Sequence, residues 1–198
     1  MTAVVYKILI STKRFFQSIV HTIQFFLFNI SIGKNWKIEG LIFIRNSGLG
    51  GITIGNNFSA NSGASKNPIG GDTVLRLITK KSGKIVIKEN VGISNSTLYS
   101  EELILIEDDV LIGGGCCIWD TDFHSLDKNK RGTSLDEGNT QPIIIKKKAF
   151  IGAKAIILKS VVIGENSIVA AGSVVTKSIP DNQIWGGNPA KFIRNINE

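Results

Sequence analysis

The stretch IIIKKKAFIGAKAIILKSVVIGENSIVAAGSVVTKSIP, residues 143–180, places an aliphatic side chain at every sixth position. These positions are Ile145, Ile151, Ile157, Ile163, Val169 and Val175. Two residues before each of them stands a small or aliphatic residue: Ile143, Ala149, Ala155, Val161, Ser167 and Ser173. A period of six fits neither an α-helix nor a plain alternating strand. It fits a short strand and a turn, repeated so that one aliphatic side chain always points inward.

The same pairing occurs earlier in the chain, in two further blocks. Ile106, Ile112 and Ile118 follow Ile104, Val110 and Cys116, and Ile87, Ile93 and Tyr99 follow Ile85, Val91 and Thr97. The step from Tyr99 to Ile106 is seven residues, which is a slip of one residue between the blocks. Three strand-and-turn units close a triangular coil, and stacked coils bury a continuous aliphatic column. The spacing therefore predicts an all-β solenoid of parallel strands.

Two blocks carry a resemblance to a known family: AFIGAKAIILKSVVIGENSIVAAGSVVTKSIP, residues 149–180, and WGGNPAKFIR, residues 185–194. They resemble the hexapeptide-repeat acyltransferases, in particular the branch of galactoside, maltose and polysaccharide O-acetyltransferases. The resemblance covers roughly residues 40–194, and the ending GGNPAK is its most specific part. It implies a left-handed parallel β-helix, a homotrimer and acetyl-CoA as the acyl donor.

Composition and charge narrow the class of protein. The chain has 198 residues, 42% of them hydrophobic and 20% charged, which is typical of a globular protein. The net charge of +7 suits phosphorylated ligands or anionic lipid, whereas scattered basic residues without a binding motif argue against nucleic acid. Cys116 and Cys117 are adjacent, and neighbouring cysteines rarely form a bridge. Since no cleavable signal is apparent, a cytoplasmic location is expected.

Residues 1–33 form a segment of a different kind. No charged residue occurs from Phe15 to Gly33, and apolar residues recur there at helical spacing, but interspersed polar residues argue against a membrane span. Two interpretations of this predicted helix remain open. Beside Lys7, Lys13 and Arg14 it suits peripheral contact with anionic lipid at the inner face of a membrane. Alternatively, it packs on the base of the trimer.

The rest of the chain, residues 34–198, is expected to form the β-helix domain and a C-terminal tail. Irregular excursions interrupt it near residues 62–82 and 120–141. Long excursions from a compact array are usually functional. One of the two histidines, His21, falls in the N-terminal helix, where we expect it on the polar side without a chemical role. The other, His124, opens the second excursion.

Acyl transfer requires a base that takes the proton of the incoming hydroxyl or amine. Histidine suits this role because it titrates near physiological pH. The resemblance assigns the role to His124, and Asp122 is the carboxylate expected to orient its ring. Asp120 and Asp127 are expected to cap turns or to be solvated. Direct attack on the thioester is favoured over an acyl-enzyme, since no serine or cysteine is visibly paired with the histidine.

The resemblance also implies a coenzyme groove between the coils of neighbouring subunits. The small residues expected to line it are Gly152, Ala153, Ala170, Ala171 and Ser173. Lys177, Lys191 and Arg194 are expected to meet the coenzyme's phosphates. Asn95 and Trp119 are candidate contacts for the acceptor. No metal is expected in catalysis: relatives of this fold that bind zinc use three histidines, and the chain has two.

The predicted function is acetyl transfer from acetyl-CoA to a sugar hydroxyl or amine, in surface polysaccharide biosynthesis. The acceptor is a sugar, free or linked to a nucleotide or a lipid. Two alternatives stay open: an antibiotic or xenobiotic acetyltransferase of the same fold, and a catalytically inactive β-helix scaffold. His124 and the GGNPAK ending argue against the scaffold.

Overall fold

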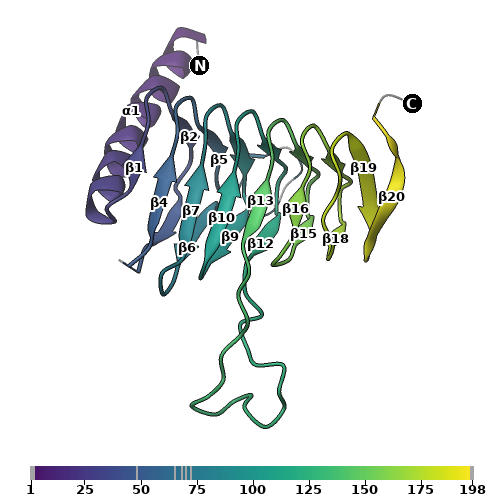
Figure 1. The fold of residues 1–198 in the computed structure, drawn as a ribbon. Helices are drawn as coiled ribbons and strands as arrows, with labels where there is room; N and C mark the ends of the chain where they lie inside the picture. The colour runs from purple at the N-terminus through teal and green to yellow at the C-terminus, as the bar shows by residue number, and fades with distance from the viewer. Residues whose placement is uncertain are drawn as a thin grey trace.

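The chain folds into one helix followed by a three-sided solenoid of short strands, as the computed structural model shows (Figure 1). The structure describes residues 3–47, 49–64, 66–67, 69, 71 and 73–196, with the backbone alone for residues 3–11, 13 and 14. Its helix, α1, comprises Ala3–Leu27. The solenoid is a left-handed parallel β-helix, which confirms the predicted fold class.

Three sheets form the sides of the solenoid. The first contains β1 (Ser31–Ile32), β4 (Gly51–Ile54), β7 (Lys84–Ile87), β10 (Leu103–Ile106), β13 (Ile143–Ile145) and β16 (Val162–Ile163). The second contains β2 (Lys37–Glu39), β5 (Ser59–Asn61), β8 (Gly92–Ser94), β11 (Leu111–Ile112), β14 (Phe150–Ile151), β17 (Ile168–Val169), β19 (Gln183–Gly187) and β20 (Ala190–Asn195). The third contains β3 (Phe43–Arg45), β6 (Arg76–Thr79), β9 (Thr97–Ser100), β12 (Cys117–Trp119), β15 (Ile156–Ile157) and β18 (Val174–Val175).

The aliphatic column predicted from the six-residue spacing fills the interior. Ile145, Ile151, Ile157, Ile163, Val169 and Val175 are all fully buried. Their partners two residues earlier, Ala and Ser included, are buried as well. Each coil stacks on the next through parallel strand pairs in register, so that the same side chain faces inward in successive coils.

The predicted inward pair Thr97 and Tyr99 is wrong by one residue. Leu98 is the buried residue of β9, and it lies opposite Ile118 of the next coil. The reason is a shorter turn before β9: the chain takes three residues from inward Ile93 to the next inward position of the repeat, Ser96, and four at the equivalent turn from Ile112 to Cys116. Tyr99 therefore faces outward.

Helix α1 packs against the N-terminal end of the solenoid (Figure 1). Phe25 lies on Trp36 with 5.6 Å between ring centroids. His21 is fully buried, contrary to the expected place on the polar side of the helix, because its Nε2 bonds the carbonyl oxygen of Gly40 at 2.8 Å. The strand β1 begins within residues 1–33, so this segment is not purely helical. Among the described residues, no helix combines the length and hydropathy needed to cross a bilayer.

The two excursions differ in how far they leave the solenoid. The first is shorter than the expected 62–82, since β6 already returns to the third sheet at Arg76. The second, residues 120–141, projects well beyond the body between β12 and β13 (Figure 1), and we call it the arm. At the other end, the expected C-terminal tail is ordered as a hairpin, with β20 antiparallel to β19.

Candidate active site

The arm starts from a fixed base at the corner where the chain turns from the third sheet to the first. Asp120 is fully buried and accepts three hydrogen bonds from the preceding coil. The donors are the Ser100 hydroxyl at 2.6 Å and the backbone N–H groups of Glu101 at 2.8 Å and Glu102 at 2.9 Å. The carbonyl of Asp120 also accepts the N–H of Gln141, so that the first and last residues of the arm are bonded to each other. The predicted capping role of Asp120 agrees with these contacts.

A tight turn then presents His124. The N–H of His124 donates to the carbonyl of Asp122 at 2.7 Å, and Phe123 between them has a φ of 62°. A bulky residue seldom adopts a positive φ, and such residues are found where surrounding structure holds them. Here the Phe123 ring packs on the outward Tyr99, with centroids 4.8 Å apart, and on Trp119, at 6.1 Å. These three rings fix the turn against the outer face of the third sheet.

The His124 ring is held by a carboxylate from the far side of the arm. Its Nδ1 lies 2.8 Å from Oδ2 of Asp136, while its side chain is 69% exposed. Asp136 also accepts the N–H groups of Ser125 at 2.7 Å and Gly132 at 2.8 Å. These two backbone donors, followed by His124, lower the pKa of Asp136 from its ordinary 3.8 to about 2.

The ionised Asp136 decides the tautomer of His124. A carboxylate without a proton only accepts hydrogen bonds, so the proton of a neutral imidazole lies on Nδ1. Nε2 then carries the free lone pair, and within the described part of the chain no hydrogen bond to it is present. An exposed ring nitrogen with a fixed lone pair can act as a general base.

The predicted partner of His124, Asp122, does not contact the ring. Its Oδ2 faces Lys159 at 3.5 Å, on the turn between β15 and β16. The orienting carboxylate is Asp136 instead, because the arm folds back and brings it to Nδ1. Asp127 bonds the N–H of Asn129 with its carboxylate, as expected of a turn residue.

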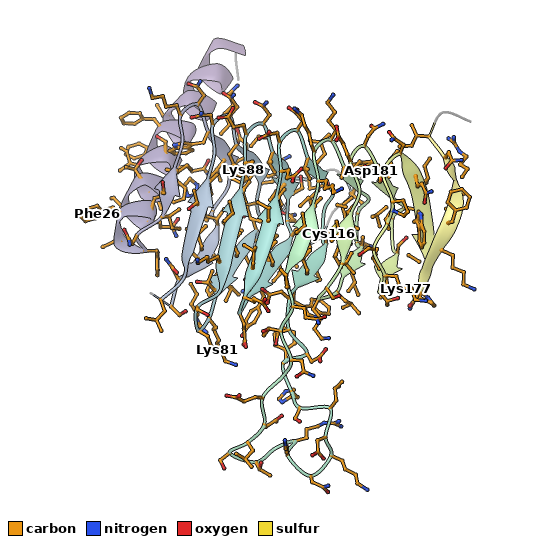
Figure 2. All side chains as sticks on the ribbon, in the orientation of Figure 1. Phe26, Lys81, Lys88, Cys116, Lys177 and Asp181 are labelled. Carbon is orange, nitrogen blue, oxygen red and sulfur yellow. The ribbon has the colours of Figure 1, made fainter. Side chains whose placement is uncertain are left out.

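Two of the three predicted phosphate contacts meet in one pocket. Lys177 and Lys191 line a cavity of about 240 Å³ together with Trp185 and Phe192 of the C-terminal hairpin. Lys177 follows β18, at the same edge of the third sheet as the arm (Figure 2). Since β18 lies two strands from β12, the step along this edge is about 10 Å. Arg194 is exposed and donates to the carbonyl of Asn195 outside this pocket.

The predicted small residues lie at the opposite edge of the third sheet. Gly152 and Ala153 connect β14 to β15, and Ala170 and Ala171 connect β17 to β18. A Cβ on Gly152 would lie 2.5 Å from the Ala171 nitrogen, so this glycine is required by the close approach of successive coils. Within one chain these residues are therefore separated from His124 by the width of the sheet.

Two further candidates make contacts inside the protein. Ser173 is buried, and its hydroxyl donates to the Ala170 carbonyl and accepts the N–H of Gly187, which attaches the hairpin. Asn95 is buried too, and its side-chain amide pairs with both backbone groups of Gly63. Asn95 therefore anchors the first excursion through its side-chain amide.

Sequence reasoning missed Phe123, whose ring holds the turn before His124, and three further residues of this region. Asp136 lies 12 residues after His124, in an irregular segment without a period that could predict the contact. Trp185 and Phe192 belong to the blocks that carry the resemblance, and they pair with each other in the hairpin beside the pocket. Their place in those blocks, with Phe192 directly after Lys191, was the available signal.

Comparison with known proteins supports the predicted resemblance. Residues 142–177 match the family model described as bacterial transferase hexapeptide (six repeats). The galactoside O-acetyltransferase of Lactococcus lactis is 38% identical over 106 residues, which are 52% of this chain and 49% of that protein. WbbJ of Escherichia coli K12, named as a candidate lipopolysaccharide biosynthesis O-acetyl transferase, is 29% identical over 78% of this chain and 76% of its own. The chain spans about half the length of the first curated relatives it matches.

Solved structures with this fold contain coenzyme A. A single-residue mutant of the N-acyltransferase AntD of Bacillus cereus, in complex with dTDP and coenzyme A, superposes with a TM-score of 0.67. It is 28% identical over 83% of each chain. A galactoside acetyltransferase in complex with coenzyme A gives a TM-score of 0.55 and 27% identity, over 84% of this chain and 65% of the other. The resemblance to hexapeptide-repeat acyltransferases is confirmed.

Proposed function

We propose that this protein transfers an acetyl group from acetyl-CoA to a hydroxyl, or an amine, of a sugar. The observation that carries the proposal is the pair formed by His124 and Asp136 at 2.8 Å. It leaves Nε2 with a free lone pair at the edge of the sheet that also presents Lys177. The coenzyme A complexes of the structural neighbours support the choice of donor.

In this reaction His124 takes up one proton and then passes it on. Its Nε2 takes the proton of the acceptor hydroxyl while the oxygen attacks the carbonyl carbon of the thioester. The carbon–oxygen bond forms, the carbon–sulfur bond breaks, and Nε2–H then protonates the leaving sulfur. Asp136 stabilises the imidazolium that exists between these two transfers, since it remains ionised. The products are an acetylated sugar and the free thiol.

The pocket at the C-terminal hairpin fits the nucleotide end of the donor. The two ammonium groups of Lys177 and Lys191 suit phosphates, because hydrogen bonds from charged donors are the strong ones. The rings of Trp185 and Phe192 suit a stacked purine. From this pocket the donor's arm would run along the edge of the third sheet toward His124.

We further propose that the site is completed by a second copy in a homotrimer. His124 stands on an arm that projects from the body, and the small residues that suit the donor's amide groups lie across the third sheet. A neighbouring copy that places its own small residues beside the arm would bring both parts together. Light scattering tests this: a mass three times the 21.5 kDa of the chain is expected, and a monomer at micromolar concentration contradicts it.

The proposed acceptor is a sugar of a surface polysaccharide, presented free or linked to a nucleotide or a lipid. The names of WbbJ and of the galactoside O-acetyltransferases support a sugar hydroxyl. The complex of an AntD mutant with dTDP-4-amino-4,6-dideoxyglucose supports an amine on a nucleotide-linked sugar. Trp119 and Phe123, on the outer face of the third sheet beside His124, are suited to stack on a sugar ring.

Two measurements test the proposal. Coenzyme A at 100 times its dissociation constant should stabilise the folded protein by about 2.7 kcal/mol, which a thermal shift detects. Incubation with acetyl-CoA and a panel of sugars, with thiol release as the signal, should then reveal turnover that depends on the acceptor. A protein that binds no coenzyme and releases no thiol with any sugar would be a scaffold.

A further inference from the structure

Helix α1 has two opposite faces, and the solenoid covers only one of them. The covered face contains His21 and Phe25, which are buried against Trp36 and Gly40. The opposite face is exposed along its whole described length. It comprises Phe15, Phe16, Ile19, Val20, Ile23, Phe26 and Leu27, and we call it the outer face.

The outer face is a continuous strip of large apolar side chains. At about 100° per residue, its seven members fall within an arc of about 140°. Phe16 is 66% exposed and Phe26 is 86% exposed, and Phe26 projects away from the body (Figure 2). Exposed apolar strips of this size mark sites of interaction with a protein or a membrane. We therefore expect the strip to be covered by a binding partner or a membrane.

The charge distribution of the chain indicates which occupant. Residues 1–38 contain five basic residues and no acidic residue. The remaining 160 residues contain 18 basic and 16 acidic residues, so most of the net charge of +7 belongs to the helix and first coil. Lys34 and Lys37 of that coil are exposed. A second copy docked face to face would bring five positive charges against five, whereas an anionic surface complements them.

The position of α1 in the fold would allow its outer face to contact a flat, extended surface. The helix lies at the N-terminal end of the solenoid, away from the arm and from the hairpin at the opposite end (Figure 1). Because one face is packed on the first coil, the helix can lie along an interface without leaving the protein. Helices with a strong apolar face and basic flanks bind in this way, with the apolar side chains at the acyl boundary.

We propose that the outer face of α1 docks the protein on an anionic lipid surface. The apolar side chains enter the acyl boundary, and the exposed Lys34 and Lys37 of the first coil contact the headgroups. In the proposed trimer, with its axis parallel to the solenoid, three such helices would face the same surface and reinforce one another. The docking itself does not depend on the proposed acetyl transfer.

The test is flotation of the full chain with vesicles. Vesicles of phosphatidylcholine alone are compared with vesicles in which about a third of the lipid is phosphatidylserine, so that the surface is strongly anionic. The protein should float with the anionic vesicles and remain at the bottom with the neutral ones. Phe16→Ser and Phe26→Ser should each weaken the partition by about tenfold or more. The matched control, Ile193→Ser, removes an exposed apolar side chain at the opposite end of the solenoid and should float like the unaltered protein.

A second pair of variants, Lys34→Gln and Lys37→Gln, separates loss of folding from loss of docking, because both side chains are exposed. Each charge removed from an anionic surface weakens the partition by about fivefold, and raised salt should do the same. No flotation of the full chain, or equal flotation with both vesicles, overturns the proposal. So does a solution species of twice the expected mass that disappears in Phe26→Ser, because the occupant is then a second copy. Thiol release with a soluble acceptor reports the proposed function separately.

Discussion

Replacing Asp136 by asparagine should show whether this carboxylate, and not another aspartate of the arm, orients the His124 ring. Oδ2 of Asp136 receives two donors, His124 Nδ1–H and the Gly132 N–H, each at 2.8 Å, and Oδ1 receives the Ser125 N–H at 2.7 Å. In either orientation of the amide, its NH₂ group opposes at least one of these donors. The ring can relieve the conflict by carrying its proton on Nε2, and this removes the lone pair that acts as the base in the proposed mechanism.

The expected cost follows from the loss of general-base catalysis. A positioned base contributes about 10²–10⁴-fold, and a wrong tautomer loses most of it. Asp136→Asn should therefore lower kcat by about 10²–10⁴-fold. Coenzyme affinity measured by calorimetry should stay within about threefold, since the pocket of Lys177 and Lys191 does not include the arm. Nitrogen-15 NMR of the two histidines should show the proton of His124 moving from Nδ1 to Nε2.

Asp122→Asn is the matched control, because it removes a carboxylate two residues from His124 that contacts Lys159 and not the ring. We expect its kcat to fall by less than about fivefold, because the positioned base and its contact with Asp136 are retained. The reasoning fails if Asp122→Asn costs as much as Asp136→Asn. It also fails if Asp136→Asn retains both the unaltered rate and the Nδ1–H tautomer.

Three further predictions address the donor pocket, the turn and the pH dependence. Lys177→Ala and Lys191→Ala should each weaken coenzyme A binding, measured by calorimetry, by about 5- to 20-fold without lowering kcat. Lys146→Ala, at another corner of the solenoid, should leave coenzyme A binding unchanged. Phe123→Ala frees the turn before His124 and should lower kcat by about tenfold at unchanged coenzyme affinity; an unchanged kcat would show that the rings do not position the base. The pKa of Asp136 is about 2, below its ordinary value, so its stabilising contribution is present above about pH 4 and is lost as the pH falls toward 2. The pH–rate profile above about pH 5 should therefore contain no step from Asp136, and a pH titration of its carboxylate by NMR checks this.

The fold could be predicted because each coil repeats one physical requirement. An aliphatic side chain must face inward once per side, and Ile145 to Val175 display that spacing without exception. The prediction was wrong at Thr97 and Tyr99, where a shorter turn after Ile93 shifts the inward positions by one residue. Turn length is set by backbone geometry that the six-residue pattern does not encode.

The site could be predicted only in part, for a related reason. His124 is identified by its residue type and by its place at the start of an excursion. Its partner Asp136 is brought to it by the irregular path of the arm, which has no period. The burial of His21 could not be predicted either. The Gly40 carbonyl that it bonds belongs to the first coil of the solenoid, and the helical pattern of residues 1–33 does not show that contact.

The most direct test of the proposed mechanism is the turnover of His124→Ala. The residue lies on the arm, outside the aliphatic column, so the variant should keep the fold, the proposed trimer and the affinity for coenzyme A. Thiol release in the presence of an identified acceptor should fall by about 10²–10⁴-fold. Turnover near that of the unaltered protein would remove His124 from the mechanism, and a parallel loss of coenzyme binding would make it a structural residue.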